Sequence, residues 1–204
     1  MTMTVYHMPM SRSNRVLWLM EELGLPYEAK KVDFAAIQGA EYKANVHPLG
    51  RVPAVVLDDG STMFESGAIL NYLLETNDND LRPKAGDADH TAYLQWFDFA
   101  EATLVVPIGN VMQHSFIKPE DQRIPGLVVQ SAAAAKEALA VIDKEMAGRD
   151  WIAGDRFTAA DIMTIYSVAL AQMAQLWSAD EFPNLGAYFA RATARPAYEA
   201  MTKA

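Results

Sequence analysis

The sequence contains no cysteine. This absence excludes disulfide scaffolds, cysteine-ligated zinc sites, thiol redox centres and cysteine nucleophiles. Basic residues are also few, because 17 Lys and Arg stand against 26 Asp and Glu and leave a net charge of −9 at pH 7. A general nucleic-acid binder needs a basic surface to displace phosphate counterions, and a protein that docks on anionic membranes needs a polybasic one. The charge balance argues against both classes.

Several chemical motifs are missing as well. No two glycines are separated by a single residue, so no GxGxxG dinucleotide loop exists, and no Walker A loop occurs. Ser66-Gly67 lacks the earlier glycine that a nucleophile elbow requires. The histidines show no metal-ligand spacing, so no metal site is expected. They are His7, His47, His90 and His114.

Targeting segments are not evident either. Residues 3–8 alternate like a strand and lack the apolar core of a secretory leader. The longest uncharged stretch that resembles a membrane span covers residues 162–179, but polar residues interrupt it, which favours a buried helix. They include Thr164, Ser167, Gln172 and Gln175. We therefore expect a cytoplasmic protein.

Hydrophobic residues make up 51% of the 204 residues, which is enough for one large or two small globular domains. The first 80 residues switch between a two-residue period and a helical period in the order β-α-β-α-β-β-α. The predicted strands cover residues 3–8, 27–32, 53–57 and 62–64. The predicted helices run from a cap at Ser13 or Asn14 to Gly24, and over residues 35–45 and 66–75.

The second part of the chain has no convincing strand. Asn, Asp, Pro83 and Gly86 gather between residues 77 and 89, which is typical of a linker. We therefore predict an α/β domain at residues 1–78, a linker at 79–89 and an all-α domain at 90–204. Its expected helices are 89–106, 111–116 beyond a break at Pro107, 125–147, 159–176, 183–194 and 196–203.

Three segments of the α/β domain place polar groups at the ends of predicted elements. The first surrounds Ser11 and Ser13, where hydroxyls and backbone N–H groups meet at a helix N-terminus and favour an anion or a thiolate. The second leads through Arg51 and Val52 into Pro53, where Val52 can pair with a bound peptide like a strand and Arg51 can hold a carboxylate. In the alternative interpretation the serines are ordinary helix caps and Pro53 merely begins a strand.

The third segment is Glu65-Ser66, between a strand and a helix. Ser66 can cap the helix, and its N–H and hydroxyl can also hold a carboxylate, while Glu65 can receive an ammonium group. Capping alone does not explain three such segments in one small domain. Together they offer a hydroxyl for a thiol, backbone pairing for a peptide and complementary charges for its zwitterionic end.

These segments resemble the soluble glutathione transferases of bacterial type. The stretch SRSNRVLWLMEELGLPYE, at residues 11–28, is especially typical, and the resemblance continues at residues 151–162. There Thr158 and Asp161 match the helix-capping box of the family, and Phe157 matches its hydrophobic staple. Residues 183–185 and 195–197 also match, so the resemblance covers essentially the whole chain.

The resemblance implies a thioredoxin-like N-terminal domain that binds glutathione as cosubstrate, a helical C-terminal domain that lines a pocket for an electrophile, and a homodimer. By position, Val52 precedes a cis Pro53 and pairs with the cysteinyl part of glutathione. Glu65 and Ser66 hold the γ-glutamyl end, and Arg51 lies near the glycyl carboxylate. His47 replaces the usual asparagine of the family before Pro48, so it has no role to inherit.

The resemblance leaves the thiol-activating residue open. Met10 stands where many relatives have Ser or Cys, and a thioether cannot donate a hydrogen bond. The hydroxyl falls one step later, so Ser11 is the first candidate and Ser13 the second. Tyr6 on the first strand resembles the tyrosine-type classes only loosely. The missing cysteine disfavours the branches of the family that use one.

The implied activity is attack of the glutathione thiolate on a small apolar electrophile, as in detoxification, with peroxidase activity as an addition. The pocket candidates recur on the predicted helices of the second domain, where an aromatic stripe is also typical of a core. Two alternatives stay open: a non-catalytic protein that binds glutathione or hydrophobic ligands, and a glutathione-dependent isomerase or dehalogenase. The pocket candidates are Met10, Phe99, Met112, Phe116 and Tyr166.

Overall fold

The computed structural model describes residues 2–204, which form two compact units. The first unit comprises the chain up to Asn79 together with Ala194–Ala204, and the second comprises Asp80–Thr193. The last eleven residues, which were expected in the helical domain, therefore belong to the α/β unit.

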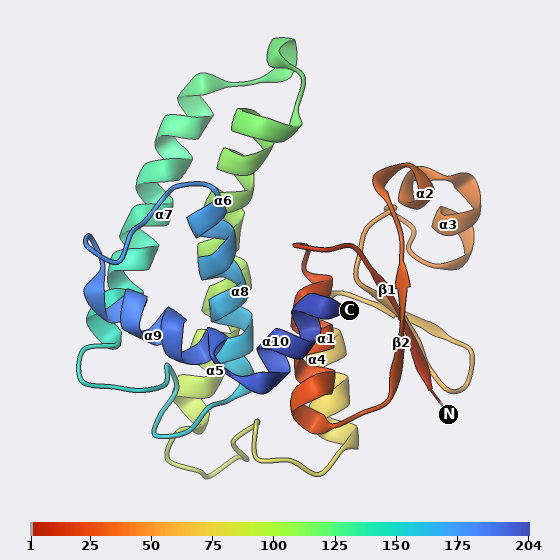
Figure 1. The fold of residues 1–204 in the computed structure, drawn as a ribbon, viewed down its shortest axis with the longest axis horizontal. Helices are drawn as coiled ribbons and strands as arrows, with labels where there is room; N and C mark the ends of the chain where they lie inside the picture. The colour runs from red at the N-terminus through yellow and green to blue at the C-terminus, as the bar shows by residue number, and fades with distance from the viewer. Residues whose placement is uncertain (1) are drawn as a thin grey trace. The chain divides into compact units, whose positions relative to one another are not determined.

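The first unit is built on a four-stranded mixed sheet with the order β2-β1-β3-β4. Its strands are β1 (Met3–His7), β2 (Tyr27–Lys31), β3 (Ala54–Val56) and β4 (Thr62–Phe64). The strands β1 and β2 run parallel, while β3 is antiparallel to both β1 and β4. This is the predicted thioredoxin-like order, and Figure 1 shows how the helices flank the sheet.

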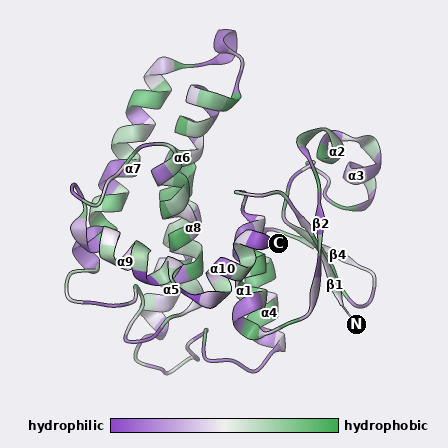
Figure 2. Ribbon diagram, in the orientation of Figure 1, coloured by the Kyte–Doolittle hydropathy of each residue, from purple (hydrophilic) through white to green (hydrophobic). Residues whose placement is uncertain are grey.

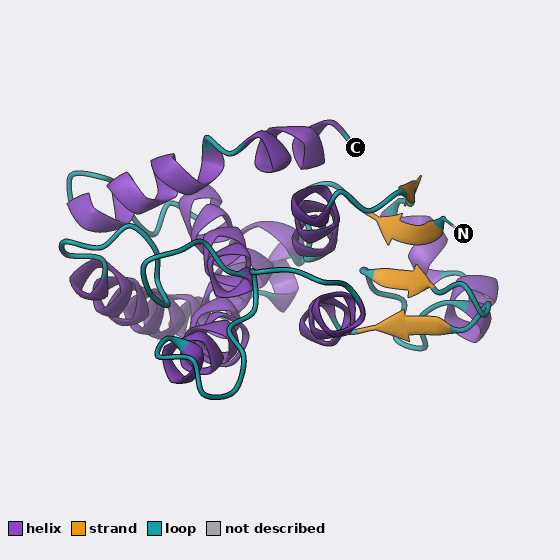
Figure 3. Ribbon diagram, turned by 90° about the horizontal axis from the view of Figure 1, so that it is seen from below, coloured by secondary structure: helices purple, strands orange, loops and turns teal. Residues whose placement is uncertain are grey.

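Helices cover both faces of this sheet (Figure 3). The helices α1 (Ser13–Leu23) and α4 (Ser66–Thr76) pack against each other, and α1 also packs on β1. Their inward side chains, such as Val16, Leu17 and Leu70, are fully buried, which makes this layer the core of the unit. The helix expected at residues 35–45 is divided into α2 (Phe34–Gln38) and α3 (Ala40–Asn45), because Gly39 between them adopts an extended conformation.

The final helix, α10 (Pro196–Lys203), packs on α1, and this contact explains why the C-terminus belongs to the first unit. The Arg195 guanidinium donates two hydrogen bonds of 2.7 Å to the Glu22 carboxylate. Trp18 Nε1 donates to the same carboxylate at 2.9 Å, and the Trp18 ring meets Tyr198 edge-on. A bidentate pair of this kind is stronger and more directional than a single ionic contact.

We expect Glu22→Gln to destabilise the protein by about 1–2 kcal/mol, because it removes one charge from the bidentate pair and leaves the tryptophan contact possible. Urea unfolding measures the loss. The matched control is Glu199→Gln, which breaks an exposed pair with Lys203 on α10 and should cost less than about 0.5 kcal/mol. Equal losses for the two variants would show that the Arg195 contact adds nothing.

The described residues of the second unit form helices and turns only. They are α5 (His90–Phe99), the π-helical turn η1 (Ala100–Leu104), α6 (Val105–Met112), the π-helical turn η2 (Gln113–Ile117), the short η3 (Glu120–Gln122), α7 (Pro125–Glu145), α8 (Ala159–Met173) and α9 (Pro183–Thr193). The break expected at Pro107 is wrong, because the helical path continues through it. The wider turn η1 lies just before this proline, where a regular helix would need the N–H that proline lacks.

The helix α8 lies at the centre of the second unit, and Figure 2 shows its strongly apolar composition. Nearly all of its side chains from Ala159 to Val168 are buried. By length and composition alone, α7 would also suit a membrane span, and in the structure it packs against α6 and α9.

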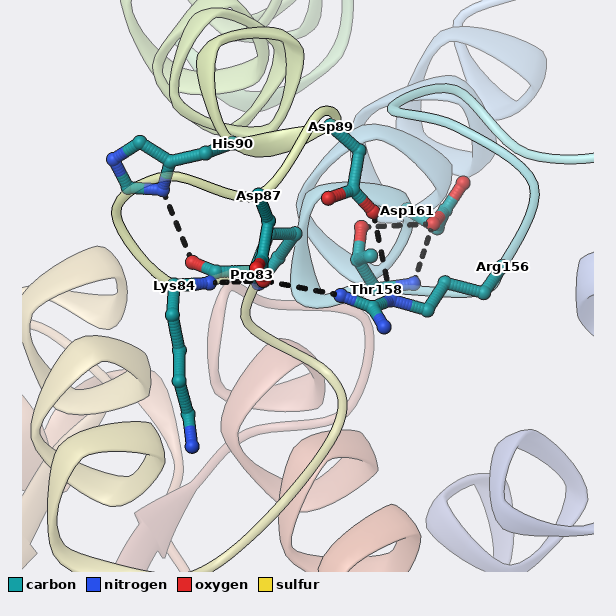
Figure 4. Close-up of polar contacts among 8 residues, drawn as sticks. All are labelled: Pro83, Lys84, Asp87, Asp89, His90, Arg156, Thr158 and Asp161. Atoms are coloured by element: carbon teal, nitrogen blue, oxygen red, sulfur yellow. Dashed lines mark hydrogen bonds and ion pairs between the residues drawn. The ribbon is translucent and has the colours of Figure 1, made fainter.

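A buried carboxylate organises the start of α8. Asp161 accepts hydrogen bonds from the backbone N–H of Thr158 at 2.7 Å and of Ile152 at 2.9 Å, and from the Thr158 hydroxyl at 3.1 Å. The Tyr188 hydroxyl of α9 donates a fourth at 2.7 Å. Figure 4 shows the Thr158 and Asp161 contacts, which form the predicted capping box.

Candidate functional site

The sheet register brings the three polar segments to one end of the sheet. Tyr6 near the end of β1 pairs with Ala54 at the start of β3, and Ala54 pairs with Phe64 at the end of β4. The segments that contain Ser11, Pro53 and Ser66 follow or precede these paired residues directly. The first unit therefore gathers at one edge the groups that lie far apart in the sequence.

The turn from β1 to α1 holds a compact hydroxyl cluster. Ser11 Oγ lies 2.7 Å from Ser13 Oγ and donates to the Met8 carbonyl at 2.7 Å. Ser13 is fully buried at the start of α1, whereas Ser11 is half-buried. Arg12 precedes the first residue of α1 and its side chain makes no capping hydrogen bond, while Ser11 Oγ accepts one from the Ser13 backbone N–H at 3.3 Å. Ser11 is the member of the pair that keeps access to solvent at the helix N-terminus.

Met10 and Tyr6 occupy different surroundings. Met10 has a φ of 61° and is exposed, so the turn places its thioether in solvent. Tyr6 lies on the face of β1 opposite to the buried His7. Its ring meets that of Tyr42 edge-on, and Lys30 Nζ lies 5.0 Å from the centroid of the Tyr6 ring. Burial, reinforced by Tyr6, raises the pKa of Tyr42 to about 12. Tyr6 is thus directed away from the hydroxyl cluster.

The segment before β3 is shaped by its backbone. The Val52–Pro53 peptide bond is cis, as the resemblance implies. Gly50 has a φ of 59°, and a Cβ there would collide with the Ile37 carbonyl oxygen, so only glycine suits this position. The Arg51 carbonyl accepts a hydrogen bond from the Tyr42 hydroxyl at 2.8 Å, and the Arg51 side chain is exposed. An exposed guanidinium beside this backbone is available to an anionic ligand.

His47 makes stabilising contacts within and beside the same segment. Its Nδ1 accepts a hydrogen bond from the Leu49 N–H at 3.2 Å, and its ring lies 4.7 Å from that of Phe64. Burial lowers its pKa, which keeps the ring neutral and able to accept. The contacts of His47 are therefore those of a structural residue in the loop.

At the end of β4, Glu65 has a φ of 74°, an unusual conformation for a residue with a side chain. Ser66 begins α4, but its hydroxyl does not cap the helix; it accepts a hydrogen bond from Arg15 Nη1 at 3.2 Å. Arg15 is fully buried on α1. Sequence reasoning missed Arg15, although a cation inside the apolar stripe of α1 was a visible signal.

The expected pocket residues divide between the units. Met10 belongs to the first unit, and the other four belong to the second. Phe99 is half-buried against Trp96 and lines a groove of about 660 Å³ on η1, α6 and α7. Met112, Phe116 and Tyr166 do not line that groove, and Phe116 is exposed. Their convergence in one pocket stays a prediction.

Comparison with known proteins identifies the family. The family model described as "Glutathione S-transferase, N-terminal domain" matches residues 1–75, and "Glutathione S-transferase, C-terminal domain" matches residues 112–196. Glutathione S-transferase 3 of Schizosaccharomyces pombe is 32% identical over 95% of this chain and 84% of its own length. The chain belongs to the glutathione S-transferase family.

Two further relatives indicate the range of the family. The structure of a sphingomonad glutathione S-transferase complexed with glutathione superposes with a TM-score of 0.85 at 30% identity, covering 98% of this chain and 97% of the other. The disulfide-bond oxidoreductase YfcG of Escherichia coli is 27% identical over 78% of this chain and 75% of its own length. Membership in the glutathione S-transferase family thus accounts for the fold, while relatives within it bear different activity names.

Proposed function

We propose that the protein is a glutathione transferase in which Ser11 activates the thiol of bound glutathione. The observation that carries this proposal is the half-buried Ser11 hydroxyl at the N-terminus of α1, on the edge of the sheet that also presents Val52 and Ser66. Ser13 is too deeply buried to touch a ligand, and Tyr6 faces the other side of β1. Burial and direction therefore favour Ser11 over both alternatives.

The remaining glutathione contacts follow from the same edge. The backbone of Val52, before the cis Pro53, pairs with the cysteinyl part of the peptide. Glu65 receives the γ-glutamyl ammonium group, and Ser66 holds its carboxylate above the buried Arg15 cation. Arg51 attracts the glycyl carboxylate. Each charged end of the peptide thus meets a group of opposite charge or a hydrogen-bond donor.

The chemistry depends on the acidity of the thiol. A free thiol has a pKa of about 8.5, so only a few per cent is thiolate at pH 7. A hydrogen bond from Ser11 and the dipole of α1 need to lower that pKa by about two pH units, which is equivalent to about 2.7 kcal/mol. One charge-assisted hydrogen bond and a helix terminus supply energies of this size. The thiolate then attacks an electrophilic carbon and displaces its leaving group, so no enzyme residue forms a covalent bond.

The second unit supplies the electrophile pocket in this proposal, with Phe99, Met112, Phe116 and Tyr166 as lining residues. Aromatic and thioether side chains suit varied apolar substrates. We further propose a homodimeric, cytoplasmic enzyme of detoxification, with glutathione peroxidase activity toward hydroperoxides as a secondary reaction of the same thiolate.

An ultraviolet titration of bound glutathione tests the function. We expect the thiolate absorbance of the complex to rise with a midpoint near pH 6.5, about two below that of free glutathione. Binding with an unshifted midpoint would instead favour a non-catalytic glutathione-binding protein, which the methionine at position 10 also suits. If glutathione does not bind at all, both functions are wrong.

A further inference from the structure

The buried His7 makes a hydrogen bond to the hydroxyl cluster formed by Ser11 and Ser13. His7 is the last residue of β1 and is nearly inaccessible to solvent. Its Nδ1 lies 2.8 Å from Ser13 Oγ, which lies 2.7 Å from Ser11 Oγ. A continuous chain of hydrogen bonds therefore joins the imidazole to the hydroxyl proposed to contact the glutathione sulfur.

The hydrogen-bonding capacity of Ser13 limits this chain to two directions. A hydroxyl has one hydrogen and two lone pairs. The Met8 N–H donates to Ser13 Oγ at 3.3 Å and occupies one lone pair, and the Met8 carbonyl, 3.2 Å away, is a further acceptor for the Ser13 hydrogen. One lone pair and one hydrogen remain for His7, Ser11 and that carbonyl, so a continuous chain through Ser13 requires it to accept from one of His7 and Ser11 and to donate to the other.

The two directions have opposite consequences for a bound ligand. If Ser13 donates to His7, it accepts the hydrogen of Ser11, and that hydrogen is no longer available to the sulfur. If His7 Nδ1–H donates to Ser13, then Ser13 donates to Ser11 and the Ser11 hydrogen is left over. In the free protein that hydrogen reaches the Met8 carbonyl at 2.7 Å, and a small rotation of the hydroxyl redirects it.

We propose that His7 is a positioning residue that holds the Nδ1–H tautomer and thereby directs the hydrogen-bond chain from His7 through Ser13 and Ser11 to the glutathione thiolate. The inference rests on the function proposed for Ser11. Hydrogen bonds aligned in one direction polarise one another, so a donor at the buried end strengthens the last bond to the sulfur. His7 and Ser13 touch no ligand and act only through Ser11.

The surroundings of His7 suit a neutral donor. Burial is the main cause that lowers its pKa, and the positive charge of the neighbouring Lys31 on β2 lowers it further. The ring is therefore uncharged at pH 7 and carries a single N–H, whose position decides the direction of the chain.

The thiolate titration tests the inference with four variants of the full chain. We expect His7→Leu and Ser13→Ala each to raise the pKa of bound glutathione by about one pH unit, which is about an eightfold loss of thiolate at pH 6. In the double variant the pKa of bound glutathione should be no higher than in either single variant, because both substitutions break the same hydrogen-bond chain. His7→Asn places an amide donor near the position of Nδ1 and should restore the lower pKa.

Binding of S-methylglutathione provides the structural control, because this analogue has no thiol. Its affinity should be the same for the wild type and all four variants, whereas a merely disruptive substitution would weaken it. If His7→Leu leaves the thiol pKa unchanged while Ser11→Ala raises it, the role of His7 is wrong and the proposed function stands. If Ser11→Ala also leaves the thiol pKa unchanged, both the role of His7 and the proposed function of Ser11 are wrong.

The histidine tautomer can be measured without any substitution. Nitrogen-15 NMR of the ring distinguishes Nδ1–H from Nε2–H, and comparison with His7→Asn assigns the signal. We expect Nδ1–H in the wild-type protein at pH 7. An Nε2–H tautomer would overturn the proposed direction even if the Leu variant failed to fold.

Discussion

Ser11→Ala is expected to lower turnover with an activated aryl chloride about tenfold at pH 6. If the bound thiol pKa returns from about 6.5 to about 8.5, the thiolate fraction at pH 6 falls about 75-fold. The more basic thiolate is a better nucleophile by about eightfold, with a Brønsted coefficient near 0.45, and offsets part of that loss. The deficit should therefore shrink as the pH rises, vanish near about pH 7.7 and reverse at higher pH, which a kcat–pH profile measures.

Two matched variants separate activation from binding. Ser11→Thr retains a hydroxyl and should keep the wild-type pH profile. Ser66→Ala removes the hydroxyl beside Arg15 and should weaken glutathione binding about tenfold without moving the thiol pKa. A wild-type profile in Ser11→Ala would assign the activation to another group, with Ser13→Ala and Tyr6→Phe as the next variants to measure.

Asp161→Ala is expected to cause a large loss of stability, about 3–5 kcal/mol in urea unfolding. Asp161 is fully buried and accepts four hydrogen bonds, two of them from backbone N–H groups. Alanine leaves those donors buried without an acceptor, and each such donor costs more than the net value of the bond itself. The start of α8 and its link to α9 both depend on this one carboxylate.

Tyr188→Phe is the matched control, because it removes one of the four donors and keeps the ring in the core. It should cost about 1–2 kcal/mol. A loss from Asp161→Ala no greater than that from Tyr188→Phe would contradict the central role of the carboxylate.

The same residue gives the stability a pH dependence. Burial raises the pKa of Asp161 to about 6, against the opposing effect of its four donors. Because the folded-state pKa lies above the unfolded value of about 3.9, the folded state binds the extra proton, and the contribution of this group to stability falls as the pH rises from about 4 to about 6. Asp161→Asn should remove this part of the pH dependence.

The order of elements in the first unit was predictable because each strand and helix is short and has its own period. Alternation marked β1, the segment Asp58-Asp59-Gly60 is typical of a hairpin turn and lies between β3 and β4, and Gly24 marked the end of α1 with a φ of 63°. The capping box at Thr158 and Asp161 was readable for the same reason, since its partners lie three residues apart. Local signals of this kind need no knowledge of the fold.

Other features depend on contacts between residues that are distant in the sequence. Pro107 looked like a helix end, but the turn η1 accommodates it. Arg195 looked like part of the helical domain, although its partner Glu22 lies on α1, 173 residues away. Ser66 looked like a helix cap until burial brought Arg15 to its hydroxyl. A local propensity is a weak preference that a buried charge contact or a packed helix overrides.

The sequence by itself therefore determined the family, the two-part architecture and the three segments of the candidate site, because these are written in spacing and residue type. Only the tertiary structure decided which hydroxyl remains accessible, that Tyr6 faces away from it and that His7 lies behind it. The physical reason is that burial and hydrogen-bond direction belong to the packed sheet and helices together. His7 in the sequence is one of four histidines without a pattern, and in the fold it is the buried end of a hydrogen-bond chain.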